Sequence, residues 1–247
     1  MNIQKELNKL KREKIDVLSR SSNLGIILSP TIRSSIYLNV FRGLGLKFEK
    51  FIYFKSSNKQ KFEINKKIII NKFKNINKNV FEQIKNEKNL SVINTDKDFS
   101  KKFKNLINKS NTDYFIYSGL PGQILPTELL SDKKRILHCH PGKLPNYRGS
   151  TTIYYSILNK KKIYFTCIIL DQKIDNGKVF YEQEVDIKQN INIDFIFDPF
   201  YRAFTIAKGI KYLENFQKKK NNRKDDFEYF VIHPILRLLA TKQKNIE

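Results

Sequence analysis

Two histidines and one aspartate stand out as side chains that could do chemistry together. His138 and His140 lie in the segment 135–140, which is expected to be a strand, and alternate residues of a strand point to the same face. The two imidazoles therefore emerge together at its carboxyl end. Asp175 follows in the turn "DQKIDNG". An imidazole with an ordinary pKa of about 6.5 can accept or donate a proton near neutral pH, and a carboxylate can orient it or stabilise its charged form.

The residues that follow the histidines are typical of a loop. Pro141 and Gly142 end the strand, and Gly149 with Ser150 is expected to open the next helix, leaving backbone N–H groups available to an anion. Each of these patterns also has an ordinary structural interpretation. A His-x-His pair can be incidental, and an aspartate in a glycine-containing turn is often only a turn former.

The elements that must position these side chains alternate in type along the chain. Short apolar runs of strand length are separated by segments with helical spacing. This alternation predicts right-handed βαβ units and an open, mostly parallel sheet with helices on both faces. Ligands of such sheets bind beyond the carboxyl ends of the strands. The expected strands are 24–29, 48–54, 90–93 and 114–117, and the expected helices are 34–44, 79–88 and 96–108.

The pattern changes beyond residue 160. Two β-rich runs at 163–170 and 179–187 are expected to pair antiparallel. Helices are expected at 194–218 and 231–240, separated by the charged linker "KKKNNRKDD", which we interpret as a solvated loop, with a nucleic-acid-binding arm as the alternative. We divide the chain into a basic N-terminal helical extension (1–22), an α/β domain (23–190) and a short helical C-terminal extension (191–247).

Composition limits the classes of protein. The 47 Lys and Arg residues exceed the 24 Asp and Glu residues, giving a formal net charge of +23. Such a charge could attract nucleic acid, anionic membranes or phosphorylated substrates, but lysine recurs along the whole chain, which favours a solvated surface. The 2 cysteines indicate a reducing compartment. The apolar runs are too short to span a membrane and no signal peptide is evident, so a cytoplasmic protein is expected.

The segments "HCHPGKLPNYRGS" and "IDNG" together resemble the folate-dependent formyltransferase family, which includes methionyl-tRNA, glycinamide ribonucleotide and sugar-nucleotide formyltransferases. The family core reads Asn-x-His-x-Ser-Leu-Leu-Pro-x-x-(Arg)-Gly, followed by Asp-x-Gly. The family histidine falls on His140, and its aspartate falls on Asp175. His138 occupies the position of the family asparagine. The resemblance implies a Rossmann-like α/β core that uses 10-formyltetrahydrofolate and no metal.

The resemblance also implies roles for residues near the site. It places His138, His140 and Asp175 in catalysis, and Arg148 with Gly149 in substrate binding. The loop "YFIYSGLPGQILPTELL" resembles the family loop that holds the pterin ring. Its residues Gln123, Ile124 and Leu125 are therefore expected to bind the folate.

The acceptor is expected to be a small molecule, the amino group of a nucleotide-linked amino sugar used in cell-surface glycan synthesis such as lipopolysaccharide. The initiator-tRNA enzymes that the sequence resembles carry an additional C-terminal β-barrel. Here only 60 residues follow residue 187, and they have helical patterns, so tRNA is expected to be an unlikely partner. The first strand leads into "SPTIRSS" rather than the Gly/Ser-rich phosphate loop of the purine-pathway members. A homodimer stays open.

Three alternatives remain at this point. The chain could be a diverged, non-catalytic module that binds folate or a nucleotide. It could be a metal-dependent hydrolase with His138, His140 and Asp175 as ligands, because imidazole and carboxylate suit zinc. It could also be a basic nucleic-acid binder, whose affinity would fall steeply with salt.

Overall fold

The computed structural model describes the greater part of the chain. The described residues are 8, 23–55, 79–95, 98–120, 122–130, 133–159, 162–186, 192–213 and 230–243. The expected N-terminal helix, except for residue 8, and the linker "KKKNNRKDD" lie outside them. The division of the chain into 1–22, 23–190 and 191–247 stays a prediction, as does the homodimer.

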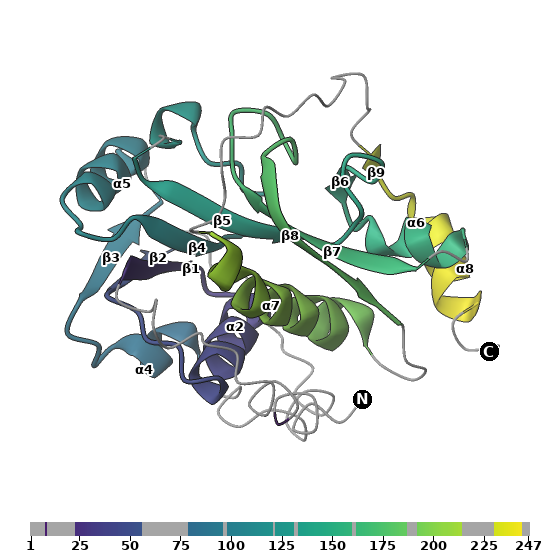
Figure 1. Cartoon of the computed structure of the whole chain (residues 1–247), viewed down its shortest axis with the longest axis horizontal. Coiled ribbons are helices and arrows are strands. Elements are labelled where there is room, and N and C mark those ends of the chain that lie inside the picture. The colour runs from purple at the N-terminus through teal and green to yellow at the C-terminus, as the bar shows by residue number, and fades with distance from the viewer. Residues whose placement is uncertain are drawn as a thin grey trace.

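A seven-stranded sheet forms the centre of the fold (Figure 1), and its spatial order is β3-β2-β1-β4-β5-β7-β8. The pairs within β3-β2-β1-β4-β5 are parallel, whereas β5 and β8 both pair antiparallel with β7. The prediction of a mostly parallel sheet with an antiparallel hairpin after residue 160 is confirmed. The strands are β1 (Leu24–Leu28), β2 (Lys50–Lys55), β3 (Leu90–Asn94), β4 (Tyr114–Ser118), β5 (Arg135–His140), β7 (Ile163–Ile169) and β8 (Lys178–Val185).

Helices cover both faces of the sheet, as expected. Figure 1 shows α2 (Ile32–Gly43), α4 (Val80–Ile84) and α7 (Asp198–Gly209) on one face and α5 (Phe99–Asn108) on the other. Central strands are consequently apolar on both sides. In β1, Ile26 packs into the core beneath α2 and α7, while its neighbour Ile27 packs into the core beneath α5.

The same alternation orients strand β5. Leu137 and Cys139 pack into the core on the α2 and α7 side. Ile136, two residues before His138, packs into the core on the other side. This confirms that the two histidines share the face opposite Leu137 and Cys139. Both also lie near the carboxyl end of β5, beside the ends of β1 and β4.

The helix α2 begins at a side-chain cap. The Thr31 hydroxyl accepts a hydrogen bond from the Ser34 N–H at 3.1 Å, which satisfies one of the N–H groups that lack a partner in the first turn of a helix. The Ser34 hydroxyl donates to the Ser118 carbonyl at 3.0 Å. The loop after β1 is thereby tied to the end of β4, next to the carboxyl ends of the parallel strands.

One expectation about the loop after β5 is wrong. Gly149 and Ser150 do not open a helix. They form the short strand β6 (Gly149–Ser150), which pairs in parallel with β9 (Phe230–Val231). Gly149 has a φ of 118°, which favours glycine. The helix α6 (Ile153–Leu158) starts only after this pairing has ended.

The C-terminal part of the described chain is helical, as expected, but in several pieces. A π-helical turn (Ile193–Phe197) leads into α7, and a 3-10 turn (Ile210–Tyr212) follows it. The helix α8 (Pro234–Gln243) lies beside α6 (Figure 1). A further 3-10 turn (Thr127–Leu129) follows β4.

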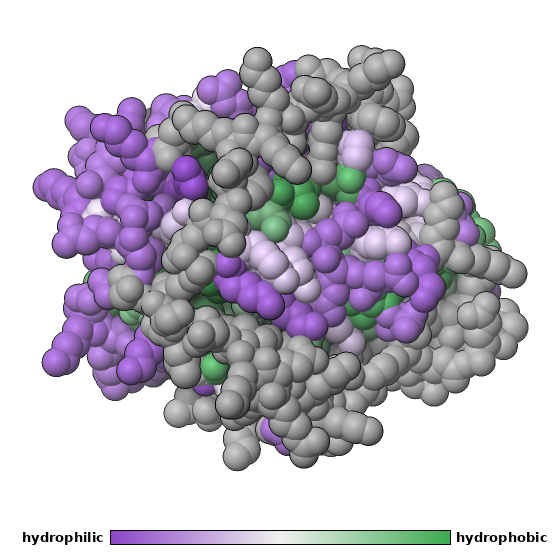
Figure 2. All heavy atoms as spheres, viewed as in Figure 1, coloured by the Kyte–Doolittle hydropathy of each residue, from purple (hydrophilic) through white to green (hydrophobic). Residues whose placement is uncertain are grey.

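The surface seen in Figure 2 is mainly hydrophilic around α5. There Lys101, Lys102 and Lys104 are exposed, while Phe103 and Ile107 are buried on the opposite side of the helix. Among the described residues, no helix is long and apolar enough to cross a membrane.

Replacing Phe103 with alanine should destabilise the fold strongly. Phe103 is fully buried, with ring centroids 5.2 Å from Phe54 and 5.7 Å from Phe99. Removing such a ring leaves a cavity and should lower the free energy of unfolding by about 3–5 kcal/mol, measured by chemical denaturation. Phe195→Ala is the control, because Phe195 is 43% exposed. An equally small effect of both substitutions would contradict the assigned core.

Candidate active site

Two connected pockets lie at the carboxyl ends of β4 and β5. The smaller has a volume of about 130 Å³ and the larger about 290 Å³. Both are lined by His138 and Asp175. The residues common to both pockets are Tyr117, Gln123, Ile124, His138, Ile174 and Asp175. The place that fold geometry indicates for ligands is therefore also the place where the predicted site residues converge.

His140 is buried and held through both ring nitrogens. Its Nδ1 lies 3.3 Å from Asp175 Oδ1, and its Nε2 lies 2.5 Å from the carbonyl oxygen of Tyr147. A carbonyl oxygen and a carboxylate oxygen can only accept hydrogen bonds, so these two contacts require a proton on each ring nitrogen. The Thr152 hydroxyl is 3.2 Å from the same nitrogen. His140 therefore supports Asp175 from beneath, and neither of its nitrogens is left to face a substrate.

Asp175 is fixed by the opposite side of the site. Its Oδ2 accepts a hydrogen bond from the Gly149 N–H at 2.9 Å, so this N–H is used by a side chain of the protein. Burial alone would raise the pKa of Asp175, but His140, His138 and the Gly149 N–H outweigh it and hold this pKa well below 3.8. Asp175 is consequently a carboxylate at neutral pH.

The turn that carries Asp175 is tightly constrained. Asp175 itself has a φ of 51°, in the left-handed region that aspartate tolerates better than most residues. A Cβ on Gly177 would meet the Ile169 carbonyl oxygen at 2.0 Å, so only glycine fits there. Arg148 is buried and donates from Nη2 to Asn176 Oδ1 at 2.5 Å. Arg148 lines neither of the two pockets and acts on the turn.

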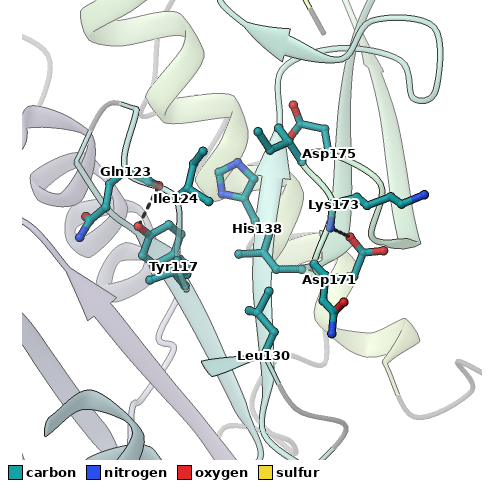
Figure 3. Close-up of a pocket in the computed structure, with 12 residues that line it drawn as sticks. Tyr117, Gln123, Ile124, Leu130, His138, Asp171, Lys173 and Asp175 are labelled. Atoms are coloured by element: carbon teal, nitrogen blue, oxygen red, sulfur yellow. Dashed lines mark hydrogen bonds between the residues drawn. The ribbon is translucent and has the colours of Figure 1, made fainter. Parts of the chain in front are cut away.

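His138 lies at the junction of the two pockets. Figure 3 shows its ring between Ile124 and Asp175, with Tyr117 below. Its Nδ1 is buried and has no hydrogen-bond partner. Burial lowers the pKa of His138 to about 3, and Arg202, Arg33 and His140 add to this against the opposing effect of Asp175. His138 is thus neutral at physiological pH, with one N–H donor and one acceptor nitrogen.

The smaller pocket contains all three residues that were expected to bind folate. Gln123, Ile124 and Leu125 form one side, and the turn after β7 forms the other (Figure 3). The side-chain oxygen of Gln123 accepts a hydrogen bond from the Leu120 N–H at 3.0 Å, which shapes the loop. Ile124 is 67% exposed, so its apolar side chain is available to a ligand. The remaining lining residues are Leu130, Leu170, Asp171, Gln172, Lys173 and Ile174, with Tyr117, His138 and Asp175.

The larger pocket contains charged residues that the sequence analysis did not identify as site residues. Arg33 comes from the first turn of α2, and Asp198 and Arg202 come from α7. The Arg202 Nε donates to Asp198 Oδ1 at 2.8 Å, and its Nη1 donates to the Cys139 carbonyl at 2.8 Å. Arg33 comes soon after the expected first strand, and ligands of such sheets bind beyond the carboxyl ends of the strands. This position was the available sequence signal for Arg33. For Arg202 no sequence signal existed, because its contact with β5 spans distant parts of the chain.

A metal site has no geometric support in the described part of the chain. No group of three or more His, Cys, Asp or Glu side chains there is placed to hold a metal ion. This includes the alternative set of His138, His140 and Asp175, in which His140 instead contacts a backbone carbonyl.

Comparison with known proteins identifies the family. The formyl transferase family matches residues 54–197, more than half of the chain. The chain belongs to the formyl transferase family. The matched range includes His138, His140 and Asp175, so the family match and the convergence of the site concern the same residues.

This family member also resembles individual curated proteins. It is 34% identical to the methionyl-tRNA formyltransferase of Campylobacter lari over 139 residues, covering 54% of this chain and 44% of that protein. It is 27% identical to the Orientia tsutsugamushi enzyme of the same name over 146 residues, covering 58% and 47%. The matched region thus spans about half the length of these relatives.

Solved structures share the fold. A 4-N formyltransferase from Francisella tularensis aligns with a TM-score of 0.53 and 19% identity, covering 90% of this chain and 86% of that one. A formyltetrahydrofolate deformylase from Pseudomonas syringae pv. tomato aligns with a TM-score of 0.55 and 14% identity, covering 81% and 65%. These identities are low, so the likeness concerns the fold.

Acidification should destabilise this protein through His138. The unfolded chain binds a proton at His138 below about pH 6.5, whereas the folded protein binds it only near pH 3. Stability should therefore fall between pH 6.5 and 3, at up to about 1.4 kcal/mol per pH unit. The stabilisation by the ionised Asp175 is complete above pH 3.8 and is lost only as the pH falls below this value, so Asp175 does not affect the slope at higher pH. His138→Asn should flatten the upper part of this profile in denaturant unfolding measured against pH.

The matched control for this pH profile is His233→Asn, because His233 is exposed. It should keep the slope of the parent protein. An unchanged slope in His138→Asn would show that His138 is not buried in neutral form.

Proposed function

We propose that the protein transfers a formyl group from 10-formyltetrahydrofolate to an amine, the amino group of a nucleotide-linked amino sugar. One observation carries the proposal. A neutral His138 and an ionised Asp175, supported by His140, lie where two pockets meet. One pocket can then hold the formyl donor and the other the amine that accepts the formyl group, with His138 and Asp175 between them.

The smaller pocket suits the donor. Its sides carry the apolar side chains of Ile124, Leu125 and Leu170, and its rim carries polar groups of Asp171 and Lys173. A flat ring with hydrogen-bonding edges matches such a lining. The buried Nδ1 of His138, which has no hydrogen-bond partner among the described residues, also indicates that a ligand group belongs beside it. When bound, 10-formyltetrahydrofolate supplies an activated formyl carbon.

Each site residue then has a defined task. An N–H of His138 donates to the formyl oxygen as negative charge develops on it, which typically contributes 10²–10³ in rate. Asp175 accepts a hydrogen bond from the attacking amine and stabilises the positive charge that develops on its nitrogen as this nitrogen bonds the formyl carbon. The proton that the amine loses passes to the folate nitrogen whose bond to that carbon breaks. His140 and the Gly149 N–H hold Asp175 in position throughout.

Two classes of acceptor deserve testing. The 4-N formyltransferase of Francisella tularensis aligns over 90% of this chain and 86% of its own, which supports a small amine. The methionyl-tRNA formyltransferases match this chain at higher sequence identity, but over about half of their length. Their names, together with the net charge of +23, support methionyl-tRNA as the second candidate.

A mass-spectrometric assay tests the proposal. The protein and 10-formyltetrahydrofolate are mixed with a panel of nucleotide-linked amino sugars, with methionyl-tRNA as the second arm. One acceptor should gain the mass of a formyl group. A product only on methionyl-tRNA would replace the sugar, whereas no product on any amine despite folate binding would favour a non-catalytic module.

Asp175→Asn should lower the rate of formyl transfer by about 10²–10³, because it removes the negative charge that stabilises the attacking amine. His140→Ala should reduce the rate through loss of the support for Asp175. Asp186→Asn is the control, since Asp186 is an exposed carboxylate that pairs with Lys162. Full turnover in folded Asp175→Asn protein, checked by circular dichroism, would refute the assigned role.

A further inference from the structure

Arg33 is a partly buried cation in the wall of the larger pocket. It follows β1 and lies in the first turn of α2. Its Nη2 donates to the Gly119 carbonyl at 2.6 Å. Its Nε is shielded from solvent and has no hydrogen-bond partner. A guanidinium has five N–H donors, so most of the donor capacity of Arg33 is unused by the protein.

The acidic residues in the same wall are already paired with other groups. Asp198 contacts Arg202 at 2.8 Å, and Asp175 contacts His140 at 3.3 Å. Asp194 contacts Arg237 of helix α8. Within the described part of the chain, Arg33 forms no ion pair with a carboxylate. Asp198 acts on its charge only from a distance, without a direct contact, and is itself paired with Arg202.

A second cation makes this arrangement less favourable. Burial lowers the pKa of Arg33, and the positive charge of Arg202 lowers it further, against the smaller opposing effects of Tyr37, Asp198 and Tyr117. Burying a charge without a counterion is costly, and a protein retains such a group where something else supplies the missing charge. The larger pocket opens directly onto Arg33, so a ligand can reach it there.

We propose that the larger pocket binds an acceptor that carries a phosphate or carboxylate group, and that Arg33 holds this group. The planar guanidinium forms paired hydrogen bonds with either kind of oxyanion. Because His138 and Asp175 line the same pocket, an anion held at Arg33 orients the acceptor relative to the reacting atoms. The inference rests on the proposed function in one respect, namely that the ligand is the amine substrate.

Anion binding can be measured without knowing the acceptor. The probes are inorganic pyrophosphate and malonate, titrated at constant ionic strength and followed by the thermal shift of the full chain. Arg33→Gln should weaken binding of the preferred probe by at least about 10-fold. Arg33→Lys keeps the charge but loses the planar donor pair, so its affinity should be intermediate.

Arg42→Gln is the matched control. Arg42 lies on the same helix but is exposed and pairs with Glu87 at 2.8 Å. It should bind the probe as the parent protein does, which separates a specific site from general attraction to a basic surface. A response to pyrophosphate alone assigns a phosphate, and a response to malonate alone assigns a carboxylate. The inference is overturned if the parent protein responds to neither probe. It is also overturned if folded Arg33→Gln and Arg33→Lys bind the probe as tightly as the parent protein does.

Kinetics with the acceptor found in the formyl-transfer assay provide the second readout. Arg33→Gln should raise the KM for the acceptor by about 10-fold or more, with a smaller effect on kcat and none on the KM for folate. Unchanged acceptor kinetics would overturn the inference and leave formyl transfer intact. Conversely, absence of formyl transfer with probe binding that depends on Arg33 would refute the proposed function and retain the anion site.

Discussion

The buried carboxylate of Asp175 is the interaction on which the rest of the site depends. It joins the histidine at the end of β5, the N–H of Gly149 in β6 and its own turn after β7. The first two segments are close in sequence, whereas the turn with Asp175 follows β7, which pairs antiparallel with β5 and so brings the turn beside them. The glycine at 177, the left-handed backbone at Asp175 and the buried Arg148 all serve to place this one group.

A charge imbalance surrounds that carboxylate. The buried Arg202 and the partly buried Arg33 lie on the side of α2 and α7, while His138 stays neutral near them and Asp175. This neutrality follows from the surroundings, because a protonated imidazole there would be a further buried cation. The replacement of the family asparagine by histidine therefore keeps an uncharged N–H donor at the junction of the pockets.

The sequence analysis predicted the sheet and its face pattern because apolar runs and period-two alternation are local properties. It also identified the histidines, Asp175 and the loop 123–125, since short motifs carry them. It was wrong about Gly149 and Ser150, whose strand depends on residues 230–231. It could not find Arg202, which reaches β5 from a helix that is distant along the chain. Its assignment of Arg148 to substrate binding stays a prediction, and the structure shows this side chain donating to Asn176 in the turn of Asp175.

The pairing of β6 with β9 has a consequence for biosynthesis. Gly149, whose N–H holds Asp175, belongs to a two-residue strand whose partner lies at Phe230–Val231. A ribosome must therefore extrude the chain beyond residue 231 before this strand can form. Up to that moment the nascent protein can assemble its central sheet, which ends with β8, yet the Asp175 carboxylate lacks the full support of the surrounding framework. Completion of this framework therefore comes later in synthesis than completion of the sheet.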